Sequence, residues 1–170
     1  MSLIKKITLI ISIIFFTNQV NSEEVKKMGT HKDWETYVIK SDNGKICFAQ
    51  SKPVLQAPKT NTREARLFIT FRPNEKISNE ISITAGYEFN TKNTITAISG
   101  KNKYKFDLIQ AEFAWMSDPK NKLEKKMIKT MKKGSRIMVK GYNQKGSQTI
   151  DHYSLLGFTK AYNATKANCS

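Results

Sequence analysis

The chain has 170 residues, with 29 Lys or Arg against 14 Asp or Glu and a formal net charge of +15 at pH 7. This length is enough for one hydrophobic core and hardly enough for two, so we expect a single domain. The positive excess predicts attraction to anionic polymers or to a membrane surface. A second explanation is composition alone, because Lys, Asn and Ile are abundant together, as in proteins from genomes rich in A and T.

The N-terminus has the pattern of a secretory signal peptide. Two lysines precede an apolar run over residues 7–16, and a polar stretch follows up to Ser22. The run is too short to cross a bilayer, which takes about 20 residues. We predict residues 1–22 as the signal peptide, cleavage between Ser22 and Glu23, and a periplasmic or extracellular protein without a transmembrane span. The alternative is that the peptide stays as an uncleaved membrane anchor. Cleavage would leave 27 basic and 14 acidic residues, a net charge of +13.

The next residues predict a leader and a first hairpin. Residues 23–32 are charged and lack periodicity, so we expect a flexible leader before a single domain over residues 33–170. Residues 33–40 and 46–51 have the composition of strands. An Asn-Gly pair between them suits a type I′ turn, which indicates a β-hairpin.

The middle of the chain contains further short strands. A loop with two prolines covers residues 52–64. Strands are predicted over residues 65–72, 77–87, 94–99, 103–109 and 111–116. Alternation places Tyr104, Phe106 and Leu108 on one face of their strand. We assign Trp115 to the core, because large aromatic side chains dominate buried area.

One helix is predicted over residues 118–133. Asp118 suits the N-cap and Pro119 the first helical position. One side is apolar at helical spacing, through Leu123, Met127, Ile128 and Met131. The opposite side carries Lys122, Lys125, Lys126, Lys129 and Lys133. We take the first four of these lysines as a candidate surface for an anionic partner; the alternative is an ordinary solvated helix face.

The C-terminal part predicts a second hairpin followed by a helix. Residues 135–142 alternate apolar and polar side chains, and a turn containing Gly146 leads to a return strand over residues 148–155. Apolar residues then recur at intervals of three and four, which predicts a short helix over residues 158–167 that lays Phe158 and Tyr162 on the core.

Eight or nine short strands, one inserted α-helix and a short C-terminal helix predict an all-β sandwich of the immunoglobulin-like kind. The chain has two cysteines, Cys47 and Cys169, which allow one intrachain pairing. Export would place them in an oxidising compartment, so we predict a disulfide between them in a monomeric protein. The alternative is that Cys169 stays free or pairs between chains.

Four parts of the chain carry a family resemblance. They are KICFAQSKP at residues 45–53, FITFRPNEKISNEISITAGYEF at 68–89, Trp115, and the run KKGSRIMVKGYNQKGSQTIDHYSLLGFTKAYNATKANC at 132–169. These parts resemble the invasion-associated locus B family of secreted alphaproteobacterial proteins. The resemblance implies a β-sandwich behind a signal peptide and a protein that acts through its surface. None of the runs is a catalytic signature.

The sequence offers no set of residues for catalysis, a metal or a cofactor. Its two histidines are His31, in the leader, and His152, in a predicted strand. Because strand neighbours point to opposite faces, His152 cannot pair locally with Asp151. A zinc set cannot be assembled, and no glycine-rich phosphate loop is present. We therefore predict a protein that is not an enzyme and holds no cofactor.

Two functions remain from different classes. The first is a non-catalytic envelope protein that interacts through its surface with an anionic envelope component or another protein. The second is a basic binder of an anionic polymer, such as lipopolysaccharide, a glycan or nucleic acid. Export argues against nucleic acid, because it separates the protein from the cytosol. A contiguous basic face would favour the binder, and evenly scattered lysines would favour composition alone.

Overall fold

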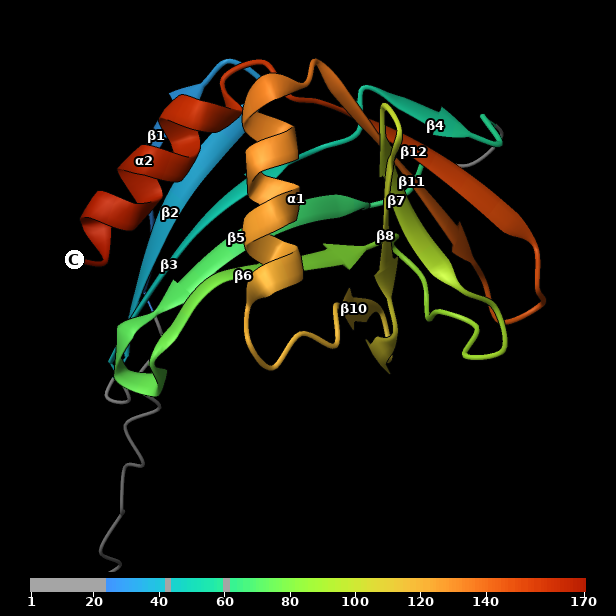
Figure 1. Ribbon diagram of the computed structural model, residues 1–170, viewed down its shortest axis with the longest axis horizontal. Coiled ribbons are helices and arrows are strands. Elements are labelled where there is room, and N and C mark those ends of the chain that lie inside the picture. Colours follow the sequence, from blue (N-terminus) through green and yellow to red (C-terminus); the bar gives the residue numbers. More distant parts are fainter. Residues whose placement is uncertain (1–23, 42–43, 60–61) are drawn as a thin grey trace, which may run out of the picture.

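The computed structural model describes residues 24–41, 44–59 and 62–170, which form two antiparallel β-sheets and two α-helices (Figure 1). The larger sheet has seven strands in the order β1-β2-β3-β5-β6-β10-β9, and the smaller has five in the order β4-β12-β11-β7-β8. The predicted all-β sandwich with one inserted and one C-terminal helix is confirmed. The predicted signal peptide and its cleavage site, Ser22 and Glu23, lie outside the described residues.

The strands of the larger sheet are β1 (Glu24–His31), β2 (Trp34–Ser41), β3 (Gly44–Ser51), β5 (Arg66–Arg72), β6 (Ile77–Thr84), β9 (Leu108–Gln110) and β10 (Phe113–Trp115). Those of the smaller sheet are β4 (Leu55–Ala57), β7 (Ile95–Ser99), β8 (Asn102–Phe106), β11 (Arg136–Tyr142) and β12 (Gln148–Ser154). The helices are α1 (Lys122–Lys133) and α2 (Phe158–Asn168), with a short 3-10 helix at Pro73–Glu75. The predicted hairpins β2–β3, β7–β8 and β11–β12 are all present.

The core lies between the inner faces of the two sheets and the two helices. Side chains alternate along a strand, so Leu67 and Ile69 of β5 both point inward and are fully buried. Trp34 of β2 is also fully buried. Its indole Nε1 donates a hydrogen bond to the carbonyl oxygen of Ser154 at 3.0 Å, and its ring meets that of Phe158 edge-on at 4.9 Å. These contacts join β2, β12 and α2.

The segment predicted as a flexible leader, residues 23–32, is an edge strand over residues 24–31 instead. β1 pairs antiparallel with β2, with one register shift. An edge strand has only one neighbour and needs no apolar face, so its charged sequence carried no alternation signal. Lys27 Nζ lies 2.5 Å from Glu35 Oε1 across the pair. This contact, together with a hydrogen bond from the Tyr37 hydroxyl, lowers the pKa of Glu35 to about 2.

Trp115, which was predicted for the core, lies with Leu108 on the outer face of the larger sheet. Leu108 is 53% exposed, and Trp115 is half-buried with its ring stacked on Phe113 at 5.7 Å. The strand predicted over residues 103–109 is divided, because β8 ends before Asp107 in one sheet and β9 begins after it in the other. The change of sheet breaks the alternation on which the prediction for Leu108 depended.

Helix α1 begins at Lys122, later than the predicted start at Asp118. Asp118 still caps the helix, because its Oδ2 accepts the backbone N–H groups of Leu123 and Glu124. The buried stripe of α1 is also displaced by one residue at this end. Leu123 is 48% exposed, whereas Glu124 is 6% exposed and lies in line with Met127 and the other buried residues.

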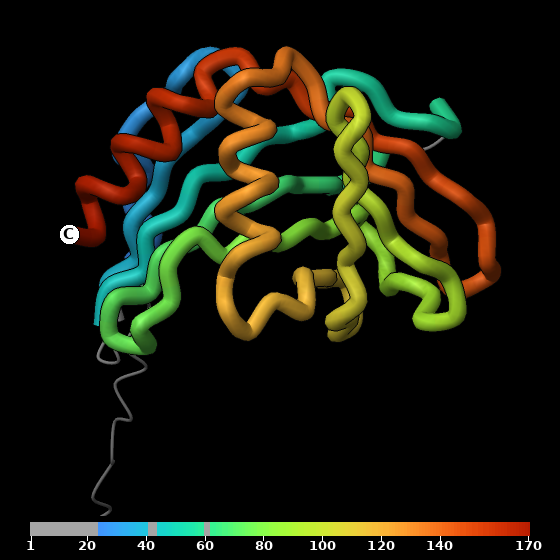
Figure 2. Tube along the Cα trace, viewed as in Figure 1, coloured from blue at the N-terminus to red at the C-terminus, as the bar shows by residue number. Residues whose placement is uncertain are grey.

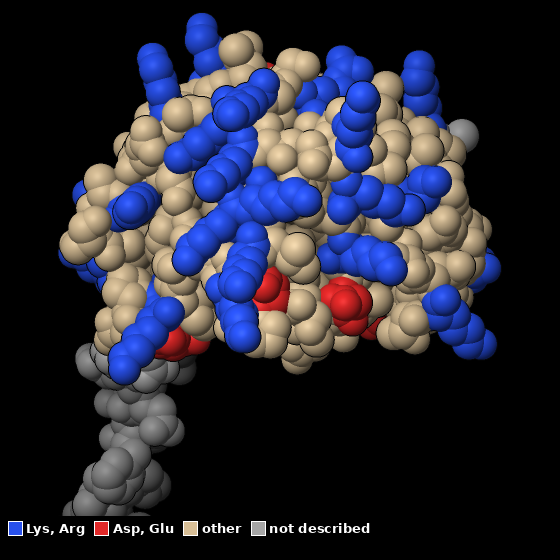
Figure 3. Space-filling model, viewed as in Figure 1, with Lys and Arg blue, Asp and Glu red and all other residues tan. Residues whose placement is uncertain are grey.

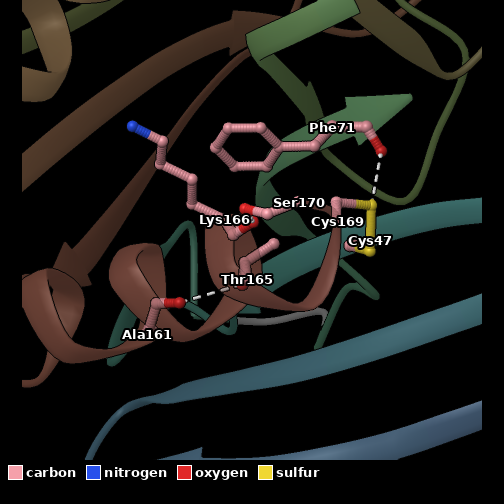
Figure 4. The surroundings of a disulfide bond; sticks show 7 residues. All are labelled: Cys47, Phe71, Ala161, Thr165, Lys166, Cys169 and Ser170. Atoms are coloured by element: carbon pink, nitrogen blue, oxygen red, sulfur yellow. Dashed lines mark hydrogen bonds between the residues drawn. A yellow bond between two sulfur atoms is a disulfide. The ribbon is translucent and has the colours of Figure 1, made fainter. Parts of the chain in front are cut away.

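Cys47 of β3 and Cys169, directly behind α2, form the predicted disulfide, with their Cα atoms 5.8 Å apart (Figure 4). The sulfur of Cys169 also lies 3.6 Å from the carbonyl oxygen of Phe71. Helix α2 contacts β2 and β3. The bridge therefore fixes the end of the last helix to the larger sheet, 122 residues away in sequence.

Candidate functional site

Helices α1 and α2 contact each other and lie on the same side of the larger sheet (Figure 2). Because α1 turns its buried stripe toward the core, its polar side faces solvent. All four lysines of the predicted surface are exposed there: Lys122, Lys125, Lys126 and Lys129. Figure 3 shows that Lys and Arg side chains gather over this face, whereas the few acidic side chains in view lie mostly in its lower part.

A hollow of about 640 Å³ lies between α1 and the turn that joins β7 to β8. Four cationic residues line it, and we call it the lysine hollow: Lys126, Lys129, Lys133 and Arg136. The lysines recur at intervals of three and four residues, which places them in one row along the helix. Ser99 Oγ donates a hydrogen bond to the carbonyl oxygen of Arg136 at 3.0 Å and so ties β7 to the start of β11.

A second basic hollow, of about 470 Å³, lies on the other side of α1, beside the disulfide. Lys125 lines it together with Lys76 and Lys166. The predicted set is therefore divided, since Lys126 and Lys129 border the lysine hollow and Lys125 borders this one. Sequence reasoning missed Lys76, Lys166 and Arg136, because they come from other elements. The one local signal for Arg136 is its place just after the helix.

Positive charges on this face already influence one another. Lys132 Nζ lies 3.9 Å from the centre of the Tyr162 ring, a cation–π contact. Partial burial, and then the positive charge of Lys166, lower the pKa of Lys132. An anion that approaches this face would relieve such repulsion. The lysines of the last helical turn also meet the negative end of the helix dipole.

A different cavity, of about 750 Å³, lies at the N-terminal end of α1, and we call it the Glu124 cavity. It is bordered by the first half of β6, by β9, by the end of β10 and by the 116–121 loop. On its wall, Arg72 donates to both carboxylate oxygens of Glu80, at 2.8 and 2.9 Å. Burial, and then the negative charges of Asp118 and Glu80, raise the pKa of Glu124 to about 7, although a hydrogen bond from the backbone of Ile81 opposes this.

Sequence reasoning missed Glu124, because it reads as one more charged residue in a charged helix. The signal that was present is its spacing. Glu124 stands three and four residues before the buried Met127 and Ile128, which is the spacing of the inward stripe. A carboxyl in that position must be either buried or at the edge of a cavity, and here it is both.

The residues considered for catalysis are separated by the fold. Asp151 is 2% exposed and belongs to a buried ion pair, because Arg63 donates to its two oxygens at 2.6 and 3.0 Å. His152 points to the opposite face of β12, and its Nδ1 is buried without a hydrogen-bond partner. His31 lies at the end of β1. Asp151 thus holds the β4–β5 loop on β12.

Within residues 24–41, 44–59 and 62–170, no group of three or more His, Cys, Asp or Glu side chains is placed to hold a metal ion. In the same part of the chain, neither helix is long and apolar enough to cross a membrane.

Comparison with known proteins gives a family match. No curated protein and no solved structure matches the chain. The family model described as Invasion associated locus B (IalB) protein matches residues 34–166. The match begins at Trp34, the buried anchor of β2, and ends within α2, so it covers α1 and every strand of the two sheets except β1. Because it spans well over half of the 170 residues, the chain belongs to the invasion-associated locus B family.

Proposed function

We propose that this protein is an exported, monomeric, non-catalytic envelope protein that holds an anionic envelope component on its basic face. The family supports a role at the envelope. The intramolecular disulfide fits a protein that folds in an oxidising compartment. The ligand groups that suit this face are phosphates, such as those of lipopolysaccharide.

The observation that carries the proposal is the lysine hollow. Four cations from α1 and β11 border one depression, and none of its described lining residues is acidic. The hydroxyl group of Ser135 and the amide of Asn102 add hydrogen-bonding groups at its wall. A phosphate accepts hydrogen bonds at several oxygens, so it can contact two or three of these groups at once. A lysine row on an ordinary solvated helix would lack this second wall.

The test measures binding of the purified protein to immobilised lipopolysaccharide. In the variant, Lys126, Lys129, Lys133 and Arg136 are all replaced by Gln. The matched control carries four exposed lysines replaced by Gln at other elements: Lys52, Lys59, Lys92 and Lys145. Both variants lose four positive charges, but only the first variant loses those that line the lysine hollow.

We expect the variant of the hollow to bind about thirtyfold more weakly than the control, from four exposed contacts at roughly 0.5 kcal/mol each. Binding should fall steeply with salt, because exposed charges are screened beyond about 8 Å at physiological ionic strength. Lipopolysaccharide stripped of phosphate should bind poorly. Equal weakening by the two variants would mean that net charge, rather than this hollow, attracts the ligand, and the proposal would be wrong.

A further inference from the structure

The Glu124 cavity lies beside an unpaired stretch of sheet edge. Strand β10 pairs with β6 only from Ser82 to Thr84, so the first half of β6 has no strand on that side among the described residues. Two side chains from the start of α1 occupy the edge instead. The backbone N–H of Ile81 donates to Glu124 Oε1 at 3.3 Å, and Asn121 Nδ2 donates to the carbonyl oxygen of Ser78 at 2.5 Å.

The floor of this cavity contains a buried hydrogen-bond acceptor that lacks a donor. Asn121 Oδ1 is buried and has no hydrogen-bond partner in the protein. Beside it, Glu124 is 94% buried and accepts the backbone N–H of Ile81 at its Oε1. A buried acceptor without a donor is costly, and burying a carboxyl group is costly too unless it is paired. The floor is therefore suited to a ligand group that carries several N–H or O–H donors.

The charge of the cavity is opposite to that of the rest of this face. Three carboxylates line it, from Glu80, Asp118 and Glu124, against two cations, Arg72 and Lys76. Arg72 is already engaged by Glu80 and also donates to Glu75 at 3.0 Å, while Lys76 is exposed at the rim. Above about pH 7, where Glu124 has lost its proton, the charge nearest the floor is thus negative. An anionic ligand would be repelled there, and a cationic one attracted.

The remaining wall is apolar and partly open to solvent. Trp115 and Met116 line one side, and Leu108, which is 53% exposed, lies at the rim with Ile109 behind it. The face of an indole ring attracts a cation, and the neighbouring aliphatic groups favour an alkyl chain. The volume of about 750 Å³ is within the usual range for small-molecule sites.

From this arrangement we infer that the Glu124 cavity binds a primary amine carried on an apolar chain. The ammonium group has three N–H donors, enough to serve Glu124, Asn121 Oδ1 and Asp118 together. The chain lies along Trp115 and Leu108. A neutral alcohol offers one donor and no charge, so it satisfies the floor poorly. This inference is independent of the anion site, because the two sites lie at opposite ends of α1 and share no lining residue.

The test titrates hexylamine into the purified, isotopically labelled protein and follows the indole N–H signals by NMR. The chain has two tryptophans, so Trp34, which is fully buried and donates to Ser154, is the internal reference for Trp115. We expect a saturable shift of the Trp115 signal at millimolar amine, with the Trp34 signal unmoved. Hexanol, of the same length without the charge, should bind at least tenfold more weakly.

Two variants separate a ligand role for Glu124 from a structural one. Glu124→Gln keeps an oxygen for the N–H of Ile81 but removes the negative charge, so the sheet edge stays capped while amine affinity falls at least tenfold. Glu112→Gln removes the same charge from an exposed position in the β9–β10 turn and should leave affinity unchanged. Absence of a saturable Trp115 shift, equal binding of hexanol, or full affinity in Glu124→Gln would each overturn the inference.

Discussion

The buried carboxyl of Glu124 should make the protein less stable as the pH rises. Its pKa is raised from 4.5 to about 7 in the folded protein. Between these values the unfolded chain releases the proton and the folded chain keeps it, so rising pH favours unfolding. The stabilising contribution is complete below about pH 4.5 and is lost as the pH passes through about 7. Glu124→Gln cannot titrate and should remove this dependence.

The size of the effect follows from the difference in pKa. Each pKa unit corresponds to about 1.4 kcal/mol, so the rise from 4.5 to about 7 corresponds to about 3.4 kcal/mol at most. Glu124 borders an open cavity, where water can reach part of the carboxyl. We therefore expect the free energy of unfolding of the natural protein to fall by about 1–3 kcal/mol, relative to the Gln variant, between about pH 5 and pH 8.

The assay is urea denaturation of both proteins at several pH values across this window, followed by Trp fluorescence. The difference between the two free energies of unfolding isolates Glu124. Glu35 does not interfere, because its pKa is lowered to about 2 and its stabilising contribution is lost only as the pH falls below its ordinary value of 4.5. A difference that stays constant from pH 5 to pH 8, or that favours the natural protein as the pH rises, would refute the reasoning.

Three further results are expected. Replacing Cys47 and Cys169 together by Ser should lower the free energy of unfolding by about 2–5 kcal/mol in urea, because the bridge closes a long loop; two free thiols in the unfolded, unreduced protein would contradict the disulfide. Asp151→Asn should cost about 3 kcal/mol, because it leaves the Arg63 guanidinium buried without its partner, and a loss below about 1 kcal/mol in thermal unfolding would show that the pair is dispensable. Intact mass of the exported protein should place its N-terminus at Glu23, and a mass that retains residues 1–22 would mean an anchored protein.

Several features follow from local sequence alone. The β2–β3 and β11–β12 hairpins have strong turn residues between alternating runs, and short-range chemistry determines them. The disulfide also follows from sequence, because only one intrachain pairing of Cys47 and Cys169 exists. Family membership is carried by runs spread over most of the chain. For the hairpins the information lies within one segment, and for the disulfide it lies in the number of cysteines.

The candidate sites depend on tertiary structure. The lysine hollow needs Arg136 of β11 opposite the α1 lysines, and the second basic hollow brings together Lys76 and Lys166, which are 90 positions apart in the sequence. No local sequence pattern relates residues that are so far apart in the chain.

Burial was likewise decided by neighbours rather than by residue type. Trp115 lies on the outer face, because β10 pairs with β6 in a register that turns Ala114 inward. Glu124 is buried, because the edge of β6 leaves the N–H of Ile81 without a strand partner and α1 brings a carboxylate to it. A sequence specifies which groups a chain carries, but the pairing of distant strands decides which of them are withdrawn from water.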